Sequence, residues 1–215
     1  MNLEGNGIES WDELAGFKHL KDFTHLIVNK NKIREIYYKP GFRGLKYLSF
    51  DDNLIESWKT FDALNEFDRR IEEIRCNGNP ITTDLDTENK RCKQIAISRI
   101  ESLRKYNGTK IEEHERKDFE LFYMKICYEV YLKEVLVVKD EKDRKVESID
   151  DPEMAAYMAE FHPRFYEFVH KFGSPLDMVN LKSEGKNIGS HAAKVELCNE
   201  VEGINGKKLT KKLIL

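Results

Sequence analysis

The sequence has few of the features that mark secreted, membrane-spanning or metal-bound proteins. Its 215 residues include four cysteines at wide spacings and without a CxxC pair: Cys76, Cys92, Cys127 and Cys198. A disulfide-stapled scaffold and a zinc module are therefore poor interpretations. No apolar run reaches the roughly 18–20 residues that span a bilayer, and residues 1–6 have neither the basic nor the apolar segment of a secretory signal. We expect a protein of the reducing cytosol that does not enter a membrane.

Basic charge and catalytic motifs are also scarce. The chain has 36 Lys and Arg against 39 Asp and Glu, a formal net charge of −3, which does not favour a general nucleic-acid binder. It has no nucleophile elbow, P-loop, HExxH or dinucleotide fingerprint. His114 stands among glutamates, which fits a solvated helix start better than a metal site. We predict a protein that is not an enzyme, needs no cofactor or metal, and acts through a binding surface.

What the sequence does contain is a repeat. Residues 23–33, 45–55 and 71–81 each fit L-x-x-L-x-L-x-x-N-x-L, the consensus of the leucine-rich repeat, and residues 1–8 match its second half. Successive asparagines are 25, 22 and 26 residues apart, within the period of about 20–29 residues. These asparagines are Asn6, Asn31, Asn53 and Asn79. We predict an α/β solenoid with a parallel sheet through residues near 1–3, 25–29, 47–50 and 73–76.

The repeat pattern has a physical basis. The apolar residues of each strand point into the core, and the asparagine bonds backbone groups where the strand turns, out of reach of water. Between the strands, apolar residues recur every three or four positions, as in helices packed on the convex side. These apolar residues form two predicted helical stripes. The first consists of Trp11, Leu14, Phe17 and Leu20, and the second of Trp58, Phe61, Leu64 and Phe67.

A candidate binding surface follows from the same pattern. Residues between the inward positions of each strand face the concave side, where repeat solenoids bind partners. This concave strip consists of His25, Ile27 and Asn29, then Tyr47, Ser49 and Asp51, then Glu73, Arg75 and Asn77. Ile27 and Tyr47 beside acidic residues give it an amphipathic, mildly acidic character.

The rest of the chain predicts helices and then a hairpin. A capping helix over roughly 87–106, stopped by Asn107-Gly108, closes the array, so the first domain is 1–107. A connector over 108–190 contains a helix near 112–136, an exposed charged linker at 139–151, a helix opened by Asp151-Pro152 and a short helix at 165–172. The tail at 191–215 predicts a hairpin around Asn205-Gly206. Because the chain starts inside a repeat and stops inside this hairpin, we expect it to be part of a longer protein.

Several of these segments resemble one family. Residues 99–108 and 115–123, the run His162-Pro163-Arg164-Phe165-Tyr166 and residues 171–175 are similar to tubulin-specific chaperone E. The resemblance implies that 191–215 begins a β-grasp ubiquitin-like domain. It also implies a cytoplasmic, cytoskeleton-associated folding cofactor that binds α-tubulin and other tubulin cofactors, and acts in heterodimer assembly and disassembly.

Two alternatives stay open. Nothing in the chain matches the CAP-Gly domain of full family members, and residues 179–181 and 192–196 lean toward the chaperone E-like proteins, which lack CAP-Gly. The second alternative is a leucine-rich repeat adaptor of the nuclear or ribonucleoprotein type. It needs a basic patch, and the positive residues near the predicted cap, Arg99, Arg104, Lys105 and Lys110, are mixed with glutamates. Salt dependence of binding separates an RNA-binding adaptor from a protein chaperone.

Overall fold

The computed structural model describes residues 1–20, 22–38, 40–67, 70–83, 90–132, 146 and 148–176. It has two compact units that divide between Tyr123 and Met124. This division lies beyond the predicted domain end at residue 107, because the segment after residue 107 continues the sheet and packs on the end of the array. The predicted hairpin at 191–215 and most of the predicted linker at 139–151 lie outside the described residues.

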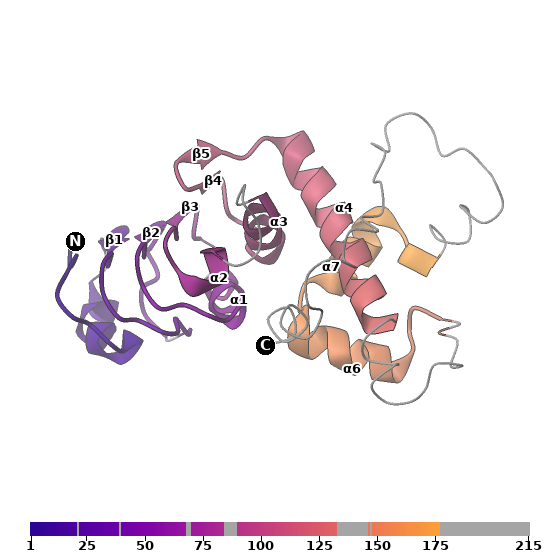
Figure 1. Ribbon diagram of the computed structural model, residues 1–215, viewed down its shortest axis with the longest axis horizontal. Helices are drawn as coiled ribbons and strands as arrows, with labels where there is room; N and C mark the ends of the chain where they lie inside the picture. Colours follow the sequence, from indigo (N-terminus) through magenta and orange to yellow (C-terminus); the bar gives the residue numbers. More distant parts are fainter. Residues whose placement is uncertain are drawn as a thin grey trace. The chain divides into compact units, whose positions relative to one another are not determined.

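Three parallel strands form the centre of the first unit. They are β1 (His25–Ile27), β2 (Tyr47–Ser49) and β3 (Glu73–Arg75), paired in register, and Asn2 adds an isolated parallel bridge to Ile27. The strands run in a row along one side, while η1 (Trp11–His19), α1 (Lys59–Asn65) and α2 (Pro80–Thr83) lie on the opposite side (Figure 1). The predicted parallel leucine-rich repeat array is confirmed.

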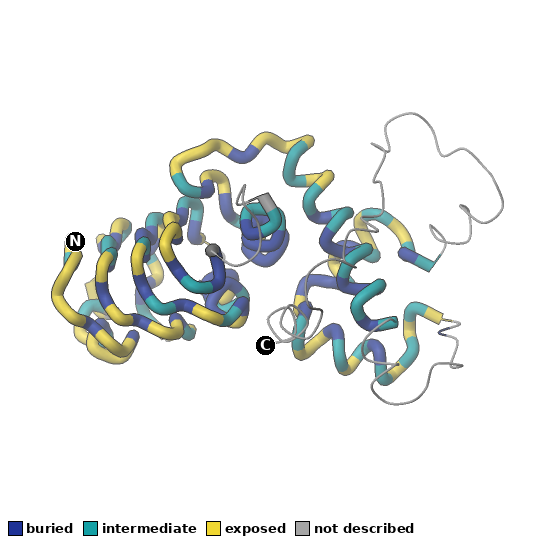
Figure 2. The backbone as a smooth tube through the Cα atoms, viewed as in Figure 1, coloured by how far each residue is buried: buried dark blue, intermediate teal, exposed yellow. Residues whose placement is uncertain are grey.

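The core of this unit lies between the strands and the helical segments. The central strand residues Leu26, Leu48 and Ile74 have no exposed surface, and burying an aliphatic side chain of this size stabilises the fold by about 1.5–3 kcal/mol. Figure 2 shows buried and exposed positions alternating along each turn of the array. All four residues of the second predicted stripe are buried. Leu20 of the first stripe is 46% exposed, because η1 ends at His19 and Leu20 has extended backbone angles that take it off the helical face.

The asparagines join each repeat to the one before it. Asn53 Nδ2 donates to the carbonyl oxygens of Phe50 (3.1 Å) and Asp51 (3.2 Å) in its own turn, and to Val28 (3.0 Å) in the preceding repeat, while its Oδ1 accepts from Ile33 N (3.1 Å). Asn31 and Asn79 make equivalent bonds. All three are buried, with 6%, 3% and 0% exposure for residues 31, 53 and 79. The predicted ladder is therefore present as a set of buried bonds to backbone.

Asn6 shares the sequence position but not the environment. It is exposed, and its amide donates to the carbonyl of Glu4 at 3.1 Å. Its backbone N–H instead donates to Oδ1 of Asn31 at 3.0 Å. Asn6 thus takes part in the ladder through its backbone, not as a buried rung.

The end of the array differs from the prediction. Helix α3 covers Lys90–Arg99 and ends before the predicted end at 106, and two short strands follow it, β4 (Lys105–Tyr106) and β5 (Thr109–Lys110). β4 pairs parallel with β3, and β5 pairs antiparallel with β4, so the sheet has five strands. Asn107 (φ 48°) and Gly108 (φ 83°) form the two-residue turn. The prediction that Asn107-Gly108 stops a helix was wrong, since this pair favours a tight hairpin whose two central residues have positive φ.

One arginine bonds the start of the next helix to the end of the repeat array. Helix α4 covers Glu113–Val130, and near its start Arg116 donates to the carbonyl oxygens of Ile97 (3.0 Å), Ile100 (3.4 Å) and Leu103. These carbonyls belong to the last turn of α3 and the segment after it, where oxygens lack partners within the helix. Arg116 also pairs with Glu120 at 3.4 Å, and the Glu120 side chain is only 3% exposed.

The second unit is helical in its described part. Tyr131 is fully buried and packs on Tyr157, with ring centroids 5.3 Å apart. Helix α6 covers Pro152–Phe161, and the Asp151 side chain accepts the N–H groups of residues 153 and 154, as the Asp-Pro signal predicted. Helix α7 covers Phe165–Phe172. Val146, within the segment predicted as an exposed linker, is buried.

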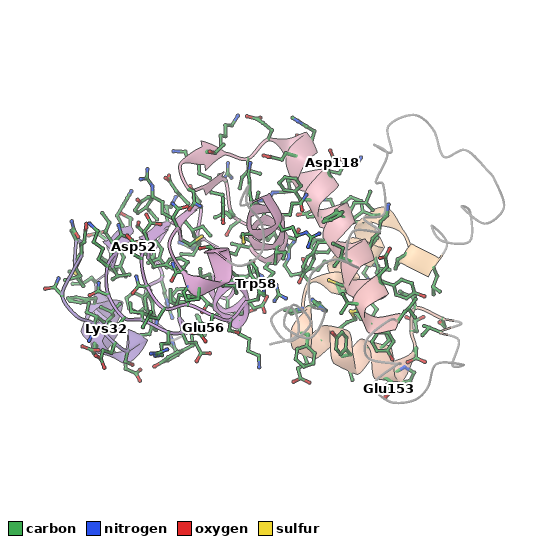
Figure 3. All side chains as sticks on the ribbon, in the orientation of Figure 1. Lys32, Asp52, Glu56, Trp58, Asp118 and Glu153 are labelled. Atoms are coloured by element: carbon green, nitrogen blue, oxygen red, sulfur yellow. The ribbon has the colours of Figure 1, made fainter. Side chains whose placement is uncertain are left out.

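Substituting Gly78 tests the tight packing between successive turns. Gly78 has φ +69°, and a Cβ there would lie 2.1 Å from Oδ1 of Asp52, labelled in Figure 3. We expect Gly78→Ala to lower the free energy of unfolding by about 2 kcal/mol, from backbone strain plus the displaced carboxylate. Gly7→Ala is the matched control, because Gly7 has φ +71° with nothing within 4 Å. It should show the strain alone, about 1 kcal/mol.

Urea unfolding followed by tryptophan fluorescence measures both variants, because Trp11 and Trp58 are the two tryptophans of the chain and both lie in the first unit. In an Asp52→Ala background, Gly78→Ala should fall to the level of Gly7→Ala. An undiminished effect there would show that the clash with Asp52 is not the cause.

Candidate partner-binding surface

The parallel register places the concave strip in cross-strand rows. His25 lies beside Tyr47, Tyr47 beside Glu73, and Glu73 beside Lys105 of β4. In the next row Ile27 lies beside Ser49, and Ser49 beside Arg75. Neighbouring strands are about 4.8 Å apart, which is close enough for side chains of one row to interact across the sheet. The structure thus brings together residues up to 80 positions apart in sequence.

The first row has an aromatic end and a charged end. The rings of His25 and Tyr47 stack with centroids 5.3 Å apart and an angle of 26° between their planes. Glu73 Oε2 lies 3.3 Å from Lys105 Nζ. His25 is exposed, and Tyr47 is partly exposed, so this stack is reachable from solvent. The surface therefore presents an aromatic pair beside an ion pair.

The remaining members of the strip form a polar chain along the strand ends. Asn29 Oδ1 accepts from Ser49 Oγ (2.7 Å) and from Asp51 N (2.9 Å). Asp51 Oδ1 accepts from Asn77 N at 2.6 Å. The Asn107 amide donates to Asn77 Oδ1 at 2.7 Å. These side chains hold successive turns together, which is a structural use that sequence reasoning did not predict.

Burial and side-chain bonding together separate the strip into two groups. Ser49 is only 1% exposed, so its hydroxyl does not reach solvent, and partial burial is the main cause that raises the pKa of Asp51. Asn29 and Asp51 are half-buried and Asn77 is exposed, but the side chains of all three are bonded to the neighbouring turn. The remaining group is His25, Ile27, Tyr47, Glu73 and Arg75, of which His25 and Arg75 are exposed and the others half-buried. We name these five residues the open strip. It combines apolar, aromatic and charged side chains, a composition suited to protein binding.

Sequence reasoning missed two residues at this surface. Lys105 extends the first row, and Asn107 extends the polar chain, because β4 adds to the sheet where a helix was predicted. The Asn-Gly pair at 107–108, flanked by Tyr106 and Ile111, was the available signal.

The described residues do not gather into a metal site. No group of three or more His, Cys, Asp or Glu is placed to hold a metal ion within the part of the chain that the structure describes. Cys76 is fully buried, and burial raises the pKa of its thiol to about 12, so it stays protonated at neutral pH. None of the described helices is both long enough and apolar enough to cross a membrane.

The segment His162-Pro163-Arg164, which carries part of the family resemblance, is largely internal. His162 and Arg164 are 5% and 6% exposed. Arg164 pairs with Glu167 at 2.8 Å and its guanidinium lies over the Phe168 ring, 4.8 Å from the centroid. This segment positions the turn between α6 and α7, and it offers less accessible surface than the open strip.

Comparison with known proteins identifies related sequences. No family model matches the chain. It is 26% identical over 209 residues to the tubulin-folding cofactor E of Arabidopsis thaliana, covering 92% of this chain and 35% of that protein. It is 25% identical over 202 residues to the human tubulin-specific chaperone cofactor E-like protein, covering 87% and 46%. The tubulin-specific chaperone E of Xenopus laevis is 26% identical over 182 residues, covering 81% and 33%.

The chain therefore spans less than half the length of these relatives. Among solved structures, the Drosophila melanogaster SNF/U2A′ complex is similar with a TM-score of 0.49 and 21% identity, covering 57% of this chain and 66% of that one. The resemblance inferred from the sequence is confirmed by the sequence comparisons: at 25–26% identity over most of its length, this chain is a partial relative of the tubulin-specific chaperone E and chaperone E-like proteins.

Proposed function

We propose that this chain is a tubulin-binding part of a folding cofactor, and that it contacts α-tubulin through the open strip. The names of its relatives supply the partner, since each is a tubulin-folding or tubulin-specific chaperone protein. The observation that carries the surface is the stack of His25 and Tyr47 on adjacent strands, beside the row that runs from Ile27 through Ser49 to Arg75. Tyrosine and arginine are enriched among the residues that dominate binding energy.

The proposed activity is non-covalent and cytoplasmic. A chaperone of this kind holds a partner in a conformation suited to assembly or disassembly, for which a preformed, rigid surface is sufficient. The buried asparagine ladder provides that rigidity, because it fixes the spacing of the strands that carry the open strip. Other tubulin cofactors are further proposed partners, and heterodimer assembly and disassembly is the proposed process.

The alternative, an adaptor of the nuclear or ribonucleoprotein type, receives less support from this surface. Lys105 is paired with Glu73, and Lys110 with Glu112 at 3.1 Å, so positive charge near the end of the array is offset by nearby carboxylates. An RNA-binding face needs unpaired cations in a continuous patch to contact phosphates.

Titration of purified tubulin heterodimer into this chain, followed by calorimetry, tests the proposal. We expect saturable binding that weakens by less than about tenfold between about 50 and about 200 mM salt, because an amphipathic strip depends only partly on charge. Binding of single-stranded RNA in place of tubulin, with a loss of about a thousandfold over the same range, would favour the adaptor. Absence of tubulin binding at both salt concentrations would overturn the proposal for this chain.

A further inference from the structure

A second accessible feature of the first unit lies outside the strands. A cavity of about 530 Å³, open to solvent, is lined by Tyr38, Pro40, Gly41, Arg43 and Arg70. Arg43 and Arg70 belong to successive repeats and stand shortly before β2 and β3, respectively. We name this cavity the arginine pocket. It shares no residue with the open strip.

The walls of the arginine pocket rest on a packed aromatic cluster. Phe42, next to Arg43, is 1% exposed, and its ring centroid lies 5.7 Å from that of Trp11 and 6.1 Å from that of Phe67. The Tyr38 ring packs edge-on against Phe67 at 5.7 Å. Arg70 N donates to the carbonyl of Phe67 at 3.1 Å. Phe67 thus supports both sides of the pocket, which fixes the backbone from which the arginines project.

The two arginines have no anionic partner among the described residues. Elsewhere in the structure Arg99 pairs with Asp62 at 2.5 Å and Arg164 with Glu167 at 2.8 Å, but no ion pair involves Arg43 or Arg70 within the described part of the chain. Both are exposed. Two guanidinium groups with available donors therefore border one cavity in a chain whose net charge is −3.

The chemistry of the lining selects the ligand. A guanidinium presents a planar fork of donors that matches carboxylate and phosphate oxygens. Phosphate sites usually add backbone N–H groups from a helix N-terminus or a glycine-rich nest. None of the lining residues lies in a described helix. The guanidinium groups of Arg43 and Arg70, on neighbouring repeats, suit two separate carboxylates along an extended peptide. The Tyr38 ring, 43% exposed, offers an apolar face beside them.

We propose that the arginine pocket binds an acidic peptide segment of a partner protein, with carboxylates on Arg43 and Arg70 and an apolar side chain against Tyr38. This site goes beyond the tubulin contact proposed for the open strip and does not depend on it. The observation that carries it is the convergence, on a single supported cavity, of one exposed tyrosine and two arginines that have no ion pair with any residue the structure describes.

Fluorescence anisotropy of the full chain tests this site. The probe is a short fluorescein-labelled peptide rich in glutamate with one central phenylalanine, and its counterpart has glutamine for every glutamate. We expect the glutamate peptide to bind and the glutamine peptide not to bind. The double variant Arg43→Gln, Arg70→Gln should weaken binding by at least about tenfold. The control double variant Arg34→Gln, Lys117→Gln, at exposed positions with the same change in charge, should weaken it by less than about twofold.

Three results would overturn the proposal. Equal weakening by both double variants would show general attraction of an anion rather than a site. No binding of the glutamate peptide at all would exclude an acidic-peptide site. Binding of inorganic phosphate, lost with Arg43→Gln, Arg70→Gln while the glutamate peptide does not bind, would assign the pocket to small anions. Circular dichroism of each variant confirms that the fold is intact, which the exposed positions of all four residues lead us to expect.

Discussion

Replacing Asn53 with alanine is expected to lower the free energy of unfolding of the first unit by about 3 kcal/mol. The substitution removes a side chain that is 3% exposed and bonds four backbone groups, three carbonyls and one N–H. The buried N–H of Ile33 is left without a partner, which costs about 1–3 kcal/mol before relaxation. The carbonyl oxygens of Val28, Phe50 and Asp51 each lose one of two donors and keep the other, which is Asn31 Nδ2, Asn79 Nδ2 and Lys30 N, respectively. Urea unfolding followed by tryptophan fluorescence is the measurement.

Asn6→Ala is the control for this prediction, because Asn6 has the same place in the repeat and is exposed, with one side-chain bond to Glu4. Its effect should stay within about 0.5 kcal/mol. Asn31→Ala should behave like Asn53→Ala, since Asn31 is buried and bonded to the backbone on both sides. Equal effects at Asn6 and Asn53 would contradict the account of the ladder.

Removing the guanidinium of Arg116 has the second large expected effect. Arg116→Ala should lower the free energy of unfolding by about 3 kcal/mol, because three carbonyls in the last turn of α3 and the segment after it lose a charged donor and the Glu120 carboxylate, 3% exposed, loses the Arg116 cation. The same fluorescence experiment measures it, since Arg116 and Glu120 both belong to the first unit.

Two variants identify the cause of this loss. Lys117→Ala, at the exposed neighbouring position, should change stability by less than about 0.5 kcal/mol. Glu120→Gln in the Arg116→Ala background should recover part of the loss, because it removes the buried charge that the arginine compensates. If Glu120→Gln lowers stability equally in both backgrounds, the two residues are not coupled.

The repeat array could be predicted from the sequence because its signals are local and repeated. Each asparagine follows its strand at a fixed spacing, so Asn31, Asn53 and Asn79 could be assigned to buried positions from the sequence, and all three are buried in the structure. Asn6 obeys the same spacing, but its exposure depends on what lies beside it in space, which the motif does not encode.

The end of the array was predicted less well. Residues 100–106 were assigned to the capping helix, yet the chain pairs with β3 as β4, since the unsatisfied edge of the sheet competes with the helix for these backbone groups. Periodicity does not report that competition. The sequence did not indicate the role of Arg116 either, because that role depends on three carbonyls between 13 and 19 residues away in the chain.

The concave strip was predicted from the alternation of strand residues. That some of its side chains bond successive turns to one another was not predicted. Alternation places Asn29, Asp51 and Asn77 on the same side as Tyr47 and cannot show that their side chains bond the next turn. Those bonds follow from the parallel register, in which Asn29 and Asp51 each meet the backbone N–H of the next turn and Asn77 meets the side-chain amide of Asn107. The open strip is therefore narrower than the surface predicted from sequence.

The most direct test of the proposed contact is the affinity of tubulin heterodimer for three forms of this chain, measured by titration at one salt concentration. The first is unaltered, the second carries Ile27→Ser, Tyr47→Ser and Arg75→Glu in the open strip, and the third carries Leu20→Ser and Arg34→Glu at exposed positions outside the strands. The second and third forms have the same net charge. We expect the second form to bind at least about thirtyfold more weakly, which is about 2 kcal/mol, and the third to bind like the unaltered chain. Equal affinity of all three forms would contradict the assignment of tubulin binding to the open strip.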